Sequence, residues 1–394
     1  MAGILDRLAG HAQPTRVDPG ALAAAVAAAR RKADPAAPAG PDGRTVRAED
    51  YGLPTVQQLR TDLPVEDPAL AAALAAARAG HWQPAAQLFW SVGQDWERRY
   101  VCTTVLASQA AQDDAWLRAW RQAHPQDAAA VTVQARSLVD LAWQIRSSNR
   151  AQDVSRDQWD GFFRMLNEVP ALCREASALA PEDPTPWIVM LPTAMGLQWP
   201  NEDFTALWTE VVRRAPYHVK AHLAALSYWR PRWSGSVEHA VHFVETAIAS
   251  APRGSLLTLL RLDLLNSELR PDDQQQRPAF WTGDQVRWAV DEALADLAAA
   301  DPGQLRVGAL RSWLARILTL EGRHAEAFEQ FRQLGSFIAF EPWSFSKDGT
   351  SLYLTTRTTA VLGWEDAGRP PLPPLPQPAA PPADSLFARY FQQI

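Results

Sequence analysis

Cysteine is nearly absent from this chain of 394 residues, in which only Cys102 and Cys173 occur. Disulfide frameworks and thiolate zinc sites use cysteines in pairs at short spacing, so neither is expected, and the two thiols are predicted to be reduced core residues. Long apolar runs are missing too, because the longest, residues 69–77, is about half of a bilayer crossing and mostly alanine. Asp6 and Arg7 follow only two large apolar residues, which predicts no signal peptide. We therefore expect a soluble, cytoplasmic protein.

An excess of positive charge is also lacking. The chain has 38 Lys and Arg against 44 Asp and Glu, which gives a net charge of −6. This sign is wrong for binding a phosphate backbone or an anionic bilayer, so neither nucleic acid nor membrane is an expected partner. Hydrophobic residues make up 47% of the chain, enough for most of it to fold around a core. The length corresponds to two or three average domains or to one extended repeat array.

Prolines recur at the ends of helix-like segments, at positions 125, 181, 216, 252 and 302. Before four of them, apolar or small residues are spaced by four and then three, which is one face of an amphipathic helix. These stripes are Val169, Cys173 and Ala176; Phe204, Trp208 and Val211; Ala240, Val244 and Ala247; and Val290, Leu294 and Leu297. Each stripe is predicted to be the second helix of a helix-turn-helix unit. Pro170 lies inside the first of these segments, so that helix is predicted to begin there.

Two further segments carry a glycine turn before such a helix. Gly80 precedes Ala85 and Phe89, and Gly322 precedes Ala327 and Phe331. The pattern resembles the tetratricopeptide repeat, whose second helix reads A-x3-F and ends at a proline. The resemblance covers roughly residues 66–340. It implies an all-α fold, an α-solenoid of tetratricopeptide-like helix-turn-helix repeats with insertions near 146–160 and 266–282. The alternative is an irregular all-helical bundle without true repeats.

The composition outside the repeats suggests five segments. They are an N-terminal helical segment (1–33), a flexible Pro/Gly/Ala linker (34–50), the solenoid with a closing helix from about residue 350 (51–365), a Pro-rich spacer (366–382) and a C-terminal amphipathic segment (383–394).

The C-terminal segment is too short to be a stable helix alone, yet it carries several large apolar residues on one helical face. We therefore expect it to dock, on its own chain or a second copy in preference to a foreign partner, with four anchors: Leu386, Phe387, Tyr390 and Phe391. The alternative is a disordered tail.

Half of the eight histidines fall in one repeat, after Pro216. Histidines four apart on a helix can share a metal ion, so His218, His222, His239 and His242 are candidate ligands for zinc, with Glu238 and Glu245 nearby. The alternative is that they are ordinary surface or packing residues. No catalytic residue can be named, because nucleophile elbows, phosphate loops, dinucleotide fingerprints and HExxH are absent, and no other cofactor is expected.

The hairpin from Ala221 to Ser236 resembles a bacterial tetratricopeptide-like domain of unknown function, on its Ala-His start and its Trp-x-Gly-Ser turn. The resemblance points to His222, Trp233, Gly235 and Ser236, and implies no activity. Gly235 is expected to turn the chain and Ser236 to cap the following helix.

Seventeen tryptophans are unusual for a helical repeat protein, in which Leu and Ala suffice for packing. The candidates for lining a groove are Trp187, Trp229, Trp233, Arg230 and Arg232. The sequence favours a scaffold or adaptor that binds a peptide or partner protein in a concave groove lined by aromatic residues and Arg. The alternatives are an enzyme or small-molecule binder using His222, His242 and nearby acids, and a purely structural subunit.

Overall fold

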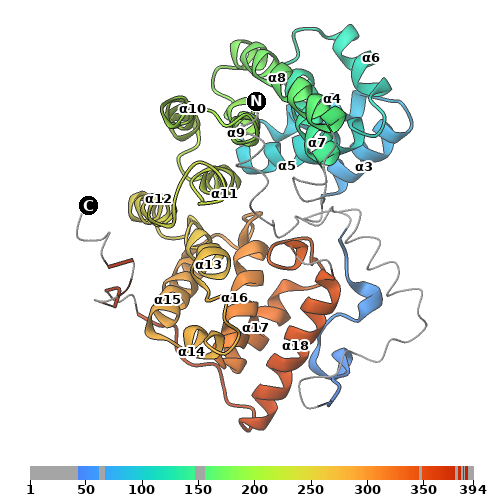
Figure 1. The fold of residues 1–394 in the computed structure, drawn as a ribbon. Coiled ribbons are helices and arrows are strands. Elements are labelled where there is room, and N and C mark those ends of the chain that lie inside the picture. Colours follow the sequence, from blue (N-terminus) through green and yellow to red (C-terminus); the bar gives the residue numbers. More distant parts are fainter. Residues whose placement is uncertain are drawn as a thin grey trace. The chain divides into compact units, whose positions relative to one another are not determined.

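The computed structural model describes residues 43–61, 67–146, 156–345, 348–377, 380–382, 385 and 387–388. Within these ranges the protein is all-helical, with sixteen α-helices and no strand (Figure 1). The all-α prediction is therefore confirmed. Two compact units are present: residues 67–240 form the first, and residues 43–61 with 241–388 form the second. Among the described helices, none combines the length and apolar character needed to cross a bilayer.

The first unit consists mainly of consecutive helices packed as neighbours. The most extensive helix–helix interface of this unit is between α7 and α8, and α9 packs against α8, α10 and α11. The helices are α3 (Pro68–Arg78), α4 (Gln83–Val92), α5 (Trp96–Ala110), α6 (Ala115–Ala123), α7 (Ala128–Arg146), α8 (Arg156–Leu179), α9 (Thr185–Gly196), α10 (Asn201–Arg214) and α11 (Val219–Tyr228), followed by α12 (Val237–Ser250), which continues into the second unit.

The second unit combines the C-terminal helices with an earlier segment of the chain. Arg60 binds residues on both sides of Phe337 through its backbone: its N–H donates to Ser336 O at 2.7 Å, and its carbonyl accepts from Ile338 N at 3.0 Å. The elements are η1 (Ala48–Tyr51), η2 (Val56–Gln58), α13 (Leu259–Leu264), the π-helical turn η4 (Leu265–Leu269), α14 (Arg277–Trp281), α15 (Asp284–Ala299), α16 (Val307–Glu321), α17 (His324–Leu334), η5 (Trp343–Phe345) and α18 (Gly349–Asp366).

The periodic signals of the sequence predict these helices well. Helices α7, α9, α11 and α16 begin a few residues after prolines 125, 181, 216 and 302, and each is followed by a second helix. After Pro252 the next helix, α13, begins later, at Leu259. All predicted stripe residues are buried except Trp208, which is half-buried. Gly80 and Gly322 have φ of 86° and 83°, a left-handed conformation that favours glycine at these turns. The closing helix predicted from about residue 350 is α18.

Gly235 and Ser236 shape the turn before α12 as predicted. A Cβ at Gly235 would lie 1.9 Å from the backbone oxygen of Trp229, so only glycine fits. The Oγ of Ser236 accepts a hydrogen bond from His239 N at 3.1 Å and so caps the helix.

The prediction that a helix begins at Pro170 is wrong, because α8 runs through it from Arg156 to Leu179. An interior proline removes one backbone hydrogen bond and costs roughly 3 kcal/mol. Apolar side chains on both sides of the proline, including Phe162, Leu166 and Cys173, are fully buried, and this burial outweighs the cost.

Two predicted boundaries also change. The linker expected over 34–50 ends earlier, since Val46 and Ala48 are buried and Ala48 begins η1. The insertion expected near 266–282 contains most of η4 and all of α14. The N-terminal segment 1–33 and most of the insertion at 146–160 lie outside the described residues.

Candidate functional site

A buried ion pair in the second unit forms the base of the candidate site. Glu245 on α12 and Arg261 on α13 have side chains only 0% and 1% exposed. The Arg261 Nε donates to Glu245 Oε1 at 2.8 Å, and its Nη2 donates to Oε2 at 2.5 Å. Two parallel charge-assisted hydrogen bonds fix the plane of the Arg261 guanidinium. The orientation of its flat faces and of its third nitrogen, Nη1, is therefore fixed as well.

Two aromatic rings share that guanidinium. The Arg261 Cζ lies 4.1 Å from the Trp288 ring centroid and 5.3 Å from that of Phe387. The two rings are 5.7 Å apart and tilted by 41°. Phe387 is fully buried, and Ser385 and Ala388 beside it are also buried. Phe387 therefore packs on Arg261 and Trp288 of its own chain. We call Glu245, Arg261 and Trp288 together the tail site.

The tail site retains one unsatisfied donor. Arg261 Nη1 is buried and has no hydrogen-bond partner among the described residues. A buried N–H of a charged group without an acceptor carries a desolvation cost. The site can therefore accept one more oxygen atom than the described part of the tail supplies.

The site corresponds in part to the sequence-based prediction. Phe387, one of the four predicted tail anchors, lies in it, whereas Leu386, Tyr390 and Phe391 are outside the described residues. Of its receiving residues, Glu245 was named only as an acid near the candidate zinc ligands, and Arg261 and Trp288 were not singled out. For Arg261 a signal exists, because it interrupts the leucine-rich stretch 256–265, where a charged residue implies a buried partner. No sequence signal distinguishes Trp288 from the other tryptophans.

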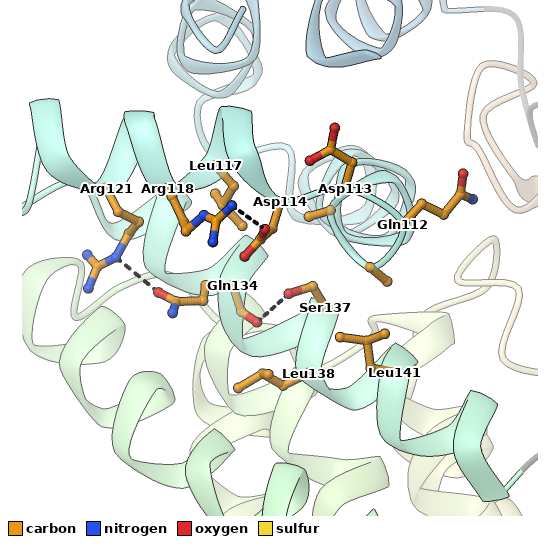
Figure 2. A pocket seen from close by; sticks show the side chains of 12 residues that line it. Gln112, Asp113, Asp114, Leu117, Arg118, Arg121, Gln134, Ser137, Leu138 and Leu141 are labelled. Atoms are coloured by element: carbon orange, nitrogen blue, oxygen red, sulfur yellow. Dashed lines mark hydrogen bonds and ion pairs between the residues drawn. The ribbon is translucent and has the colours of Figure 1, made fainter. Parts of the chain in front are cut away.

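The groove residues predicted in the first unit are used for packing. Trp233 lies edge-to-face on Trp143 with centroids 5.8 Å apart, and the Arg214 guanidinium lies 4.8 Å from the Trp187 ring centroid. Trp229 packs edge-to-face on Phe204 at 5.7 Å. Arg230 is buried and Arg232 is half-buried. None of the five predicted residues lines the pocket of this unit shown in Figure 2.

The predicted zinc ligands do not come together. In the ranges that the structure describes, no three His, Cys, Asp or Glu side chains are placed to hold a metal ion. His218 Nδ1 accepts from Ala221 N at 3.2 Å as the N-cap of α11, and His222 Nδ1 lies 3.0 Å from the His218 carbonyl oxygen. Burial lowers the pKa of His222 to about 4, and its ring packs edge-to-face on Trp208. His218 Nδ1 also lies 3.4 Å from Glu97 Oε1, so the two rings are held by the backbone, by one acid and by packing.

A pocket of about 490 Å³ in the first unit is lined by the end of α5, by α6 and by α7 (Figure 2). Leucine side chains of α6 and α7 form its apolar wall. Its arginines are held by neighbours: Arg118 pairs with Asp114 at 3.3 Å, while Arg121 bonds Gln134 at 3.1 Å and Glu175 at 2.8 Å. The pocket therefore offers a mixed surface without a charged group reserved for a ligand.

The chain matches no protein-family model, and no curated protein or solved structure is significantly similar to it.

Proposed function

We propose that the protein is a scaffold or adaptor built from tetratricopeptide-like hairpins in an α-solenoid, and that it binds a peptide of a partner protein at the tail site. The observation that carries the proposal is the complete burial of Phe387 against Trp288 and Arg261. Aromatic and Arg side chains in contact with one another often carry most of the binding energy of an interface.

The chemistry of the site defines the ligand. It is an extended or short helical segment with one aromatic side chain that contacts Trp288 and Arg261 as Phe387 does, followed by a small residue in the place of Ala388. An oxygen acceptor in the ligand, such as a carboxylate, would satisfy Arg261 Nη1. A partner peptide with this acceptor would make one hydrogen bond that the described part of the tail does not make, and this bond would favour the partner in competition with the tail.

The tail acts as a tethered competitor. A short tether raises the effective concentration of a ligand to about the millimolar range. A partner peptide must therefore displace residues 385–388, and the protein binds it best when the tail is weakened. A peptide can therefore bind the site only when Phe387 has left it.

A titration tests the proposal. A fluorescein-labelled peptide of residues 380–394 is added to the full chain and to its Phe387→Ala variant, and binding is followed by fluorescence anisotropy. We expect the variant to bind the peptide at least tenfold more tightly than the wild type, because its own tail no longer competes. The same peptide carrying Phe387→Ala is the matched control and should not bind.

A peptide library selected on the Phe387→Ala protein extends the test to partners. Selected sequences should carry an aromatic residue followed by a small one and should compete with the labelled tail peptide. The proposal fails if wild type and variant bind the labelled peptide equally, if neither binds it, or if the selected peptides do not compete with it.

A further inference from the structure

The segment after α18 is a rigid proline run. Five of the seven residues 370–376 are proline, and no helix or strand is assigned to 369–377. Proline fixes φ near −65° and favours the polyproline II conformation, which has three residues per turn. Trp364 Nε1 donates to the carbonyl oxygen of Pro370 at 2.9 Å, so the start of the run is attached to α18.

Aromatic side chains support that attachment. A hollow of about 590 Å³ in the second unit is lined by Tyr51, Phe328 and Trp364 together with residues 370–372. The Phe328 and Trp364 rings are 4.7 Å apart. Beyond the run, Phe387 is buried in the tail site of the same unit. The proline run is therefore tied to one unit at both ends.

The middle of the run presents apolar side chains to water. Leu372 is 51% exposed and Leu375 is 61% exposed. With three residues per turn, these leucines lie on one edge of a polyproline II helix, and Pro373 and Pro376 lie on the next edge. A spacer needs only prolines or polar residues, whereas two exposed leucines at this interval form a paired apolar ridge.

We infer that residues 372–376 are a ligand for an aromatic-lined groove that reads polyproline II segments. Such grooves, found in SH3 and WW domains, recognise two prolines at P-x-x-P spacing, as Pro373 and Pro376 are spaced, with the adjoining apolar side chains. The run is already stiff and tied at both ends, so its binding loses little conformational entropy. This ridge is separate from the tail site. The protein would therefore bind one partner through the ridge and a peptide at the tail site.

Isothermal titration of the full chain with a purified SH3 domain that accepts P-x-x-P ligands, and with a purified WW domain, tests the inference. We expect one of these probes to bind the wild type at a ratio of one to one. The variant Leu372→Ser/Leu375→Ser should bind it at least tenfold more weakly, with an unchanged melting temperature because both side chains are exposed.

A matched variant separates the possible outcomes. Pro374 is exposed on the third edge of the run, so Pro374→Ala should change probe affinity by less than about twofold. The probe is titrated without any tail peptide, so its binding is measured whether or not the tail site binds peptides. The inference is overturned if neither probe binds the wild type, if the double leucine variant binds as well as the wild type, or if Pro374→Ala loses as much affinity as that variant.

Discussion

Replacing Glu245 with alanine is expected to lower the free energy of unfolding by about 3–5 kcal/mol, because it leaves a buried cation without its partner. Both side chains of the pair are at most 1% exposed, and Arg261 loses two hydrogen bonds, of 2.8 and 2.5 Å. One further nitrogen of Arg261 is already unsatisfied, so the described surroundings offer the cation no substitute acceptor. Urea denaturation measures the loss as a shift of the midpoint at constant slope.

The double variant Glu245→Leu/Arg261→Met should recover most of that stability, since replacing both buried charges with apolar groups is often close to neutral. It should still bind the tail more weakly, because the contact between guanidinium and Phe387 is gone. Glu329→Ala is the control: Glu329 pairs with the exposed Arg332 at 3.0 Å, and its loss should cost about 0–1 kcal/mol. A Glu245→Ala effect no larger than the Glu329→Ala effect would refute the buried ion pair.

Three further predictions concern the fold. His222 is buried with a pKa of about 4, below the unfolded value of about 6.5. Its contribution to the free energy of unfolding is therefore fully present above pH 6.5, and it falls by about 3 kcal/mol as the pH drops to 4. Urea titrations at several pH values should show that the His222→Leu variant lacks this loss. Gly235→Ala should cost roughly 3 kcal/mol or more, whereas Gly161→Ala, inside α8 with a nearest contact of 3.7 Å, should stabilise the protein by up to about 1 kcal/mol in thermal melts. Burial raises the pKa of Cys102 to about 12 and also raises that of Cys173, so mass spectrometry should find neither thiol alkylated by iodoacetamide at pH 8 unless urea is added.

Local signals in the sequence predict much of the fold. Helix starts after the prolines, the left-handed turn at Gly322 and the Ser236 cap all depend on residues close together in the chain. Pro170 shows the limit of such rules, because buried apolar residues on both sides of it stabilise α8 as one continuous helix. Tertiary burial there outweighs a local backbone preference.

Of the candidate site, the sequence allowed only the inserted residue of the tail to be predicted, and not the residues that receive it. The spacing of apolar residues identified Phe387, but its neighbours Arg261 and Trp288 come from two separate helices, α13 and α15, and no local pattern states which helices meet. The histidine pair failed for the same reason. Spacing places His218 and His222 on one helical face, whereas the partner of each ring is set by the backbone and by residues of other helices, such as Trp96 near His218.

The central claim is that the tail site holds its own Phe387 and exchanges it for a peptide ligand. The most direct measurement is ¹⁹F NMR of the full chain with 4-fluorophenylalanine at position 387 alone. The resonance should differ from that of the same residue in the free peptide of residues 380–394, because the ring is buried against Trp288 and Arg261. It should then move to the free-peptide position when excess unlabelled peptide is added. A resonance at the free position before any addition, or one that excess peptide does not move, would contradict the claim.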